Sequence, residues 1–139
     1  MKIILCMQLI YENRHQIPLD YYELLEHVFK ISPSIRFVGI YDCHFNKITD
    51  DFQPGILQYL SREEMQNSTR YDLKRWETYK IFQQQFGEKN YAMVKYDKII
   101  LAIFPIGDKV HLRVSMEPNA DHNSIIEMIQ SLLRIPIAA

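Results

Sequence analysis

The chain has 139 residues, the size of one compact domain. Hydrophobic residues make up 47% of it and charged residues 24%, a balance that excludes an intrinsically disordered chain. Sixteen Lys and Arg residues against seventeen Asp and Glu residues give a formal net charge of −1, so no global field attracts nucleic acid or anionic lipid.

The N-terminus resembles a signal peptide only superficially. Lys2 precedes a short apolar stretch, but Gln8 interrupts that stretch, and no small-residue cleavage site follows it. We therefore expect residues 1–19 to be an N-terminal extension, with helix and strand both open for its first ten residues. Residues 20–139 are expected to form a single domain of a cytoplasmic protein without a membrane span.

A helix opens the domain. Asp20 and Glu23 have the spacing of a capping pattern, and apolar residues then recur at helical intervals as far as Ile31. Ser32 and Pro33 end the helix, because the residue before proline is disfavoured in the helical region.

A hairpin follows the helix. Residues 35–41 are typical of a strand, and residues 47–52 are typical of a short polar return strand suited to a sheet edge. Gly39 lets a neighbouring backbone or side chain approach the first strand closely. In the turn, Asn46 is the residue most able to take a positive φ.

The longest predicted element begins at a capping box formed by Ser61 and Glu64. A stripe of apolar residues continues from there to about Phe86, and Gly87 ends the helix. The stripe is thin around residues 67–69, where Asn, Ser and Thr stand, and this gap predicts either a kink or a break.

Three strands joined by short turns follow, over residues 90–96, 99–104 and 110–116. Connections this short indicate antiparallel neighbours. The last strand alternates, with His111, Arg113 and Ser115 on the face opposite its apolar residues. A closing helix starts after Asp121, its expected N-cap, and runs to about Leu133. The expected core contains Ile100, Ala102, Phe104, Leu112, Val114, Ile126 and Ile129.

This order of elements predicts an α+β domain, a five-stranded antiparallel sheet flanked by helices on both faces. The order resembles that of the roadblock/longin-like folds, which are relatives of profilin, and a PAS-like layout is the alternative. The runs at 35–40, 88–94, 104–108 and 117–122 also resemble a small family of archaeal, specifically thaumarchaeal, proteins. The resemblance covers about residues 20–134; it departs at Asn46, where glycine is usual. It implies a small adaptor or regulatory module of a kind that commonly dimerises.

Signals for catalysis are absent from the sequence. The five histidines are scattered, without the spacing of a zinc site, and no glycine-rich phosphate loop is present. Cys6 and Cys43 are expected to be free thiols, with a disulfide between them as the alternative. Asp121 beside His122 is better explained as a helix cap than as half of a catalytic pair. We therefore expect no enzyme, no cofactor and no metal, and keep an unrecognised enzyme as a third hypothesis.

Basic and aromatic residues alternate along the long helix, as on some nucleic-acid-binding surfaces. Asp72 and Glu77 interrupt the basic residues, so a solvated helix face is the better interpretation. Binding of nucleic acid is therefore not expected.

One candidate ligand site lies on the polar face of the last strand. If the covering helix leaves that face partly open, Arg36, His111 and Arg113 would line a small cationic pocket. This arrangement predicts a sensor of PAS-like type for a small anionic ligand, the alternative to an adaptor. An exposed or salt-bridged sheet face explains the same residues without a ligand.

The candidate dimer interface lies along the strand at 90–96, which is an edge in the resembled fold. Its apolar middle, with Lys95 as the charge that discourages pairing, predicts edge-to-edge association of two copies. Aromatic side chains of the long helix would add anchors to it. The predicted interface comprises Trp76, Tyr79, Phe82, Tyr91, Met93 and Lys95. The preferred function is thus a non-enzymatic adaptor that acts through protein–protein contacts as a homodimer.

Overall fold

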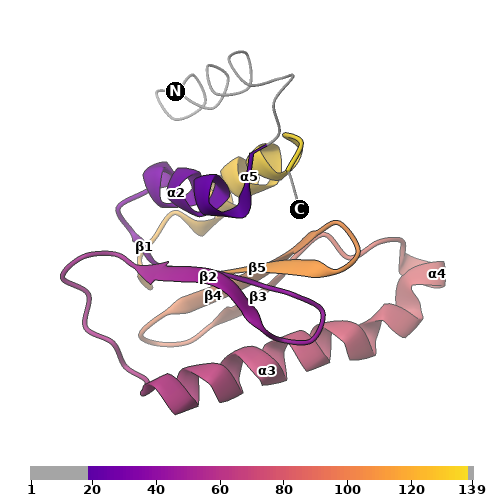
Figure 1. The fold of residues 1–139 in the computed structure, drawn as a ribbon, viewed down its shortest axis with the longest axis horizontal. Helices are drawn as coiled ribbons and strands as arrows, with labels where there is room; N and C mark the ends of the chain where they lie inside the picture. The colour runs from indigo at the N-terminus through magenta and orange to yellow at the C-terminus, as the bar shows by residue number, and fades with distance from the viewer. Residues whose placement is uncertain (1–18, 138–139) are drawn as a thin grey trace.

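The structure is a computed structural model that describes residues 19–137 (Figure 1). The expected behaviour of residues 1–18 lies outside that range. The elements in chain order are α2 (Tyr21–Ile31), β1 (Ile35–Tyr41), β2 (Lys47–Phe52), α3 (Arg62–Tyr79), the 3₁₀ turn η1 (Lys80–Phe82), α4 (Gln83–Phe86), β3 (Ala92–Lys95), β4 (Ile100–Ile106), β5 (Val110–Met116) and α5 (His122–Leu133).

The strands form one antiparallel sheet in the order β2-β1-β5-β4-β3. Strands β1, β5 and β4 lie inside the sheet, and β3 and β2 are its edges. Helices α2 and α5 lie over one face and α3 over the other (Figure 1). The predicted α+β architecture, a five-stranded antiparallel sheet with helices on both faces, is confirmed.

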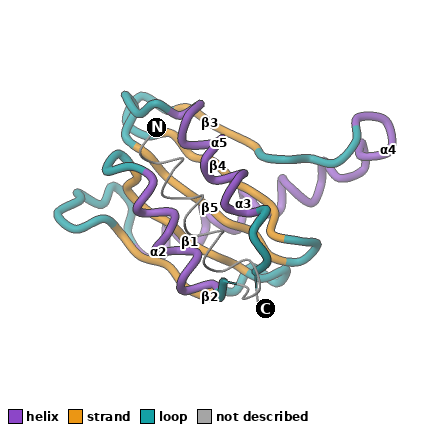
Figure 2. The backbone as a smooth tube through the Cα atoms, turned by 90° about the horizontal axis from the view of Figure 1, so that it is seen from above, coloured by secondary structure: helices purple, strands orange, loops and turns teal. Residues whose placement is uncertain are grey.

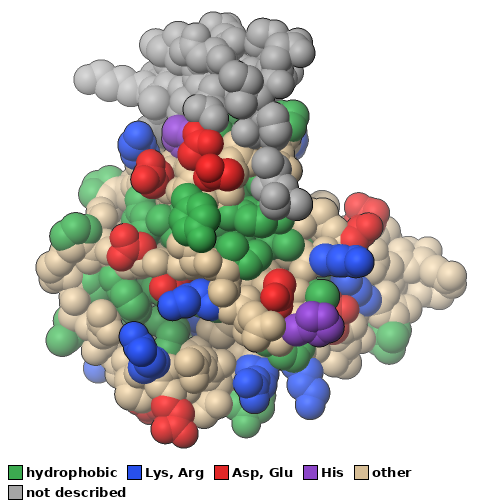
Figure 3. All heavy atoms as spheres, viewed as in Figure 1, with side chains coloured by type: hydrophobic (Ala, Val, Ile, Leu, Met, Phe, Trp, Pro, Cys, Tyr) green, Lys and Arg blue, Asp and Glu red, His purple; other side chains and the backbone are tan. Residues whose placement is uncertain are grey.

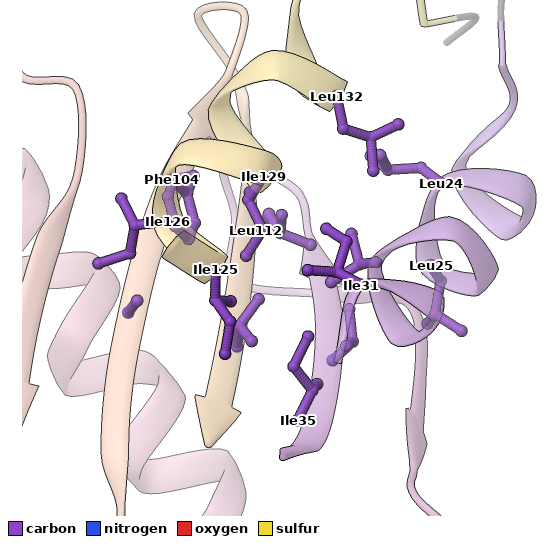
Figure 4. Packing of buried hydrophobic residues seen from close by; sticks show 14 of the residues in the cluster. Leu24, Leu25, Ile31, Ile35, Phe104, Leu112, Ile125, Ile126, Ile129 and Leu132 are labelled. Carbon is purple, nitrogen blue, oxygen red and sulfur yellow. The ribbon is translucent and has the colours of Figure 1, made fainter. Parts of the chain in front are cut away.

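The face beneath α2 and α5 is closed by aliphatic side chains. Asp20 and Asp121 cap the two helices by accepting hydrogen bonds from the backbone N–H groups of Glu23 and Ser124. Their apolar stripes then interlock with alternate residues of the strands (Figure 4). The predicted core residues are all buried there: Ile100, Ala102, Phe104, Leu112, Val114, Ile126 and Ile129.

The face beneath α3 has a smaller apolar cluster. Its buried members are Phe37, Tyr41, Leu73, Trp76 and Ile103. The capping box that predicts the start of α3 is present: the side chain of Ser61 accepts from the backbone N–H of Glu64, and the side chain of Glu64 accepts from the backbone N–H of Ser61.

The long helix is not interrupted where its apolar stripe thins. Helix α3 runs unbroken through residues 67–69 and ends at Tyr79. The change of direction comes at η1, a 3₁₀ turn, after which α4 lies beyond the end of the sheet (Figure 2). Gly87 follows with a φ of 84°, as expected for the residue that stops a helix.

The β1–β2 turn corrects a second prediction. Phe45, not Asn46, takes the positive φ, at 68°. The reason is the carboxylate of Asp42, which accepts the backbone N–H groups of His44 and Asn46 and so fixes the turn around the residue between them. Strand β3 is also shorter than the predicted strand at 90–96.

Candidate functional site

Arg113 is the polar centre of the face beneath α3. Its side chain is 2% exposed, and its Nε and Nη2 atoms lie 3.0 and 2.9 Å from Oδ2 of Asp72. Nη2 also donates to Oγ of Ser68 at 2.7 Å, and Nη1 donates to Oγ1 of Thr69 at 3.2 Å. A buried guanidinium with this many acceptors is compensated within the chain. Arg113 therefore fastens α3 to β5.

The polar gap in the apolar stripe of α3 has its explanation here. Residues three and four apart lie on one side of a helix, so Ser68 and Asp72 meet the same guanidinium. The sequence reasoning missed Ser68 and Asp72 as site residues. The signal was the run of short polar residues on the side of the helix that faces the sheet.

Arg36 also has partners within the chain. Its Nη1 atom donates to Oε1 of Glu117 at 2.7 Å, and its Nη2 atom donates to the carbonyl oxygen of Leu57 at 2.6 Å. The guanidinium carbon lies 4.7 Å from the ring centroid of Tyr59. These contacts fix the loop between β2 and α3 against the start of β1.

His111 lies at the other end of the same face. Its ring packs edge-on against Trp76, with centroids 5.7 Å apart, and its Nε2 atom is 3.9 Å from Oε1 of Glu77. Burial lowers the pKa of His111, and the nearby Lys80 and Lys89 act in the same direction, whereas Glu77 opposes them. The imidazole is therefore neutral near pH 7.

The three residues of the predicted anion pocket are not brought together. Arg36 and Arg113 line one cleft of about 720 Å³, whereas His111 lines a separate hollow of about 110 Å³ beside Lys80 and Lys89. The prediction that one pocket contains all three is corrected. Arg113 lies against Ser68 and Asp72 of α3, whereas His111 lies against Trp76 farther along the same helix.

The surface of the large cleft is mostly apolar, although polar and charged residues also line it. It opens between the N-terminal half of α3, the β2–α3 loop and the β3–β4 turn. Its walls include Tyr59, Leu60, Met65, Tyr71, Tyr96 and Leu101, and Lys98 stands at its edge. The ammonium nitrogen of Lys98 is 5.5 Å from the ring centroid of Tyr59.

The predicted dimer residues fall into two groups. Tyr79, Phe82, Tyr91, Met93 and Lys95 are exposed. Trp76, however, is 2% exposed and belongs to the core cluster beneath α3. It is therefore not available as an interface anchor, and that part of the prediction is corrected.

Exposed hydrophobic residues are concentrated in three segments of the described chain. Of thirteen large hydrophobic side chains exposed among the described residues, all but Tyr22 belong to three neighbouring segments. The β2–α3 loop and α3 contribute Leu57, Tyr59, Leu60 and Tyr71; the end of α3 with η1 and α4 contributes Tyr79, Ile81, Phe82 and Phe86; β3 and its flanks contribute Tyr91, Met93, Val94 and Tyr96. Exposed hydrophobic side chains gathered in this way are typical of an interaction surface.

On the face seen in Figure 3, the charged side chains of the described residues are not gathered by sign. Lysine and arginine side chains alternate with aspartate and glutamate on the face seen in Figure 3. Within residues 19–137 there is no cluster of three His, Cys, Asp or Glu side chains able to hold a metal ion. No helix in the same range is long and apolar enough to cross a membrane.

No protein-family model and no curated protein matches the chain. Solved structures do. A Roadblock/LC7 domain from Streptomyces avermitilis matches with a TM-score of 0.64 and 14% identity, covering 84% of this chain and 92% of that one. The gliding protein MglB from Thermus thermophilus matches with a TM-score of 0.65 and 10% identity, covering 82% and 86%. MglC from Myxococcus xanthus matches with a TM-score of 0.57 and 9% identity, covering 82% and 93%. At these identities the likeness establishes architecture alone. The chain has the fold of the Roadblock/LC7 domains.

Proposed function

We propose that this chain is a non-enzymatic adaptor or regulatory domain that acts through protein–protein contacts and forms a homodimer. The observation that carries the proposal is the concentration of exposed hydrophobic residues in three segments of the chain, one of which is the open edge strand β3. An unpaired edge with apolar side chains invites pairing with another strand. One of the similar structures is MglB in a tetrameric arrangement, so a domain of this fold is known in an assembly.

In the proposed dimer, two copies of β3 pair antiparallel across a twofold axis and join the sheets into one. Met93, 37% exposed, and Val94, 36% exposed, lie on that strand. Lys95 lies at its end, where the ammonium group stays in solvent at the rim of the interface. Such an interface should bury at least about 1,000 Å² in total.

The contacts of the polar residues on the α3 face support an adaptor more than an enzyme. Arg113 and Arg36, the cations of the α3 face, are both engaged by carboxylates of the same chain. His111 is held neutral by its surroundings. These groups stabilise the position of α3 and of the β2–α3 loop, as a scaffold requires.

The test is the mass in solution, measured by light scattering across a concentration series. We expect a dimer that Met93→Asp converts to a monomer, because a buried carboxylate at the strand pair has no partner. Tyr22→Asp is the matched control, because Tyr22 is exposed on α2 and lies outside the three segments. A wild-type chain that stays monomeric at high micromolar concentration contradicts the proposal.

The anion sensor stays the alternative function, now limited to Arg36 and Arg113. Both reach the large cleft, which has a volume in the range of small-molecule sites. A ligand would have to compete with Glu117 and Asp72 for the two guanidinium groups. A rise in melting temperature with phosphate or a small carboxylate, lost in Arg36→Gln, would favour this function over the adaptor.

We also propose that the protein is located in the cytoplasm. Cys43 is free and exposed, which suits a reducing compartment better than an oxidising one. The resemblance to an archaeal family stays a prediction of the sequence.

A further inference from the structure

The end of the long helix carries an unusual concentration of uncovered aromatic side chains. Residues 79–86, here called the aromatic arm, comprise the last residue of α3, the turn η1 and α4. Phe86 is 84% exposed, and Ile81 is 72% exposed. The arm has one charged residue, Lys80, whose ammonium nitrogen lies 3.2 Å from Oε1 of Glu77. The ammonium nitrogen of Lys89 lies 5.5 Å from the ring centroid of Tyr79, but the large apolar side chains of the arm all stay exposed to water, which is unfavourable.

The aromatic side chains of the arm form one row. The ring centroids of Tyr79 and Phe82 are 6.1 Å apart, and those of Phe82 and Phe86 are also 6.1 Å apart. These spacings are typical of aromatic side chains in contact, and both pairs are tilted. The arm is therefore an ordered apolar projection, and Figure 2 shows α4 at its tip standing clear of the sheet.

The cleft of about 720 Å³ is complementary to such a projection. Its lining is mostly apolar, with tyrosine rings from the β2–α3 loop, from α3 and from the β3–β4 turn. Tyr71 is 70% exposed and Tyr96 is 55% exposed, so these rings are open to a partner. Neither the arm nor the cleft has a strong charge of one sign to exclude the other.

The arm and the cleft lie at opposite ends of the same edge strand. Residues 87–91 connect the arm to the start of β3, whereas Tyr96, Asp97 and Lys98, which follow the end of β3, line the cleft. Helix α3 runs between the same two points, with Met65 and Ser68 at the cleft and Tyr79 at the arm. The arm of a protomer therefore cannot reach its own cleft.

A twofold axis through an antiparallel pair of β3 strands exchanges the two ends. It brings the start of one β3, and the arm attached to it, beside the end of the partner's β3, where the partner's cleft opens. The arrangement is reciprocal, so one axis produces two identical arm-and-cleft contacts.

Strand β3 is too short to form the proposed dimer interface alone. Four residues of β3 offer roughly 13 Å of edge at 3.3 Å per residue. A strand pair this short falls well below the area of a specific interface, about 1,000 Å². The exposed hydrophobic surface available to add to it is that of the arm and the cleft.

We propose that the aromatic arm of each protomer docks in the large cleft of its partner, so that a second copy of this chain is the occupant of that cleft. The proposal deepens the proposed homodimer and rests on it. The rows of aromatic rings then meet one another, with Phe82 and Phe86 against the tyrosine rings of the partner's cleft.

The test is cross-linking between two differently tagged chains. Cys6 and Cys43 are first replaced by serine in both. One chain then carries Phe82→Cys on the arm, and the other carries Lys98→Cys at the edge of the cleft. After mixing and treatment with a short thiol-reactive bismaleimide, we expect a cross-linked heterodimer. In the matched control, the second chain carries Asp108→Cys instead of Lys98→Cys. Asp108 lies in the β4–β5 turn, at the arm's own end of the sheet, so we expect little cross-linked product.

A second measurement tests the energy of the contact. Phe82→Ser with Phe86→Ser should raise the dimer dissociation constant at least about tenfold, as for the loss of aromatic anchors. Both residues are exposed, so the monomer should keep its melting temperature. A dimer without the Phe82–Lys98 cross-link, and with unchanged affinity in the double variant, overturns this inference and leaves the proposed homodimer standing. A monomeric wild type overturns both.

Discussion

The two faces of the sheet are covered in different ways. The face beneath α2 and α5 is closed by a cluster of nineteen buried hydrophobic residues among those described. The face beneath α3 has a cluster of five, supplemented by the hydrogen bonds of Arg113 and left open at the large cleft. One face is fully packed, and the other is packed in part and has an open cleft.

This difference assigns different roles to the helices. Apolar burial is non-directional and scales with area, so α2 and α5 are expected to provide most of the stability of the domain. Helix α3 is held by fewer apolar contacts and by a small number of directional polar contacts. Elements of that kind open at lower free energy than the core does. The surfaces proposed to bind a partner all belong to α3 or to the segments joined to it.

The strongest test of the closed face is Ile129→Ala. Ile129 is 0% exposed in the cluster beneath α5, so its truncation leaves a cavity that the neighbouring side chains cannot fill. We expect a loss of about 2–5 kcal/mol in the free energy of unfolding, measured by urea denaturation of the monomer. Glu127→Ala, exposed on the same helix, should change the stability by less than about 0.5 kcal/mol.

The next largest effect should come from the polar attachment of α3. Asp72→Asn removes the charge that compensates Arg113, whose side chain is 2% exposed. We expect a loss of about 2 kcal/mol, below the range for a fully buried pair because Asp72 keeps some contact with water. The loss should appear both in urea denaturation and as faster hydrogen exchange confined to α3.

A double variant separates charge compensation from packing. Replacing both partners, Asp72→Leu with Arg113→Met, leaves no unpaired charge and should cost less than Asp72→Asn alone. If the stability lost in the double variant equals the sum of the losses in Asp72→Leu and in Arg113→Met, the two side chains are not coupled. The proposed role of the pair in holding α3 is then wrong.

A smaller effect is expected where β1 passes beneath α3. A Cβ atom on Gly39 would lie 2.6 Å from the hydroxyl oxygen of Tyr41 and 2.9 Å from Cζ of Phe37. Gly39→Ala therefore forces two buried rings apart, and we expect a loss of about 1–2 kcal/mol from overpacking. Gly55→Ala would be no control, because Gly55 has a positive φ; Ser34→Ala, just before the same strand, is suitable. An unchanged melting temperature for Gly39→Ala contradicts the expected crowding.

Short sequence patterns predicted those parts of the fold that depend on residues close together in the chain. The strands at 35–41 and 110–116 were predicted with the bounds that the structure has. The three helix caps, at Asp20, Ser61 and Asp121, were also predicted in place. Capping and alternation depend on neighbours within a few residues, so one sequence is sufficient to find them.

The candidate site depended on information that is not local. Trp76 and Tyr79 are three residues apart and equally aromatic, yet Trp76 is 2% exposed and Tyr79 is 54% exposed. Which of them is buried depends on the rotation of α3 against the sheet. The observed rotation buries Leu73 and Trp76 and brings Asp72 to Arg113, which is 41 residues away in the chain. The apolar stripe of α3 includes both Trp76 and Tyr79, so the stripe alone does not show which of the two is buried.

The smallest effect is a pH dependence of the α3 face, and it comes from His111. Burial lowers the pKa of His111 below the value near 6.5 that it has in the unfolded chain. As the pH falls below about 6.5, the unfolded chain takes up a proton at this position before the folded chain does, so stability decreases until the pH reaches the lowered pKa. Above about pH 6.5 both states are neutral, and His111 adds no pH dependence. The groups that face the ring are Glu77, which favours the protonated form, and Lys80 and Lys89, which oppose it.

The difference in unfolding free energy between the wild type and His111→Gln isolates this contribution, because the other histidines are common to both chains. We expect the difference to be constant above about pH 6.5 and to shift in favour of the variant as the pH falls towards about 5. If the stability of the wild type and that of His111→Gln change with pH in parallel, Glu77 must move close enough to compensate the charge of protonated His111. The α3 face would then be more adaptable at this end than the contact of 3.9 Å indicates.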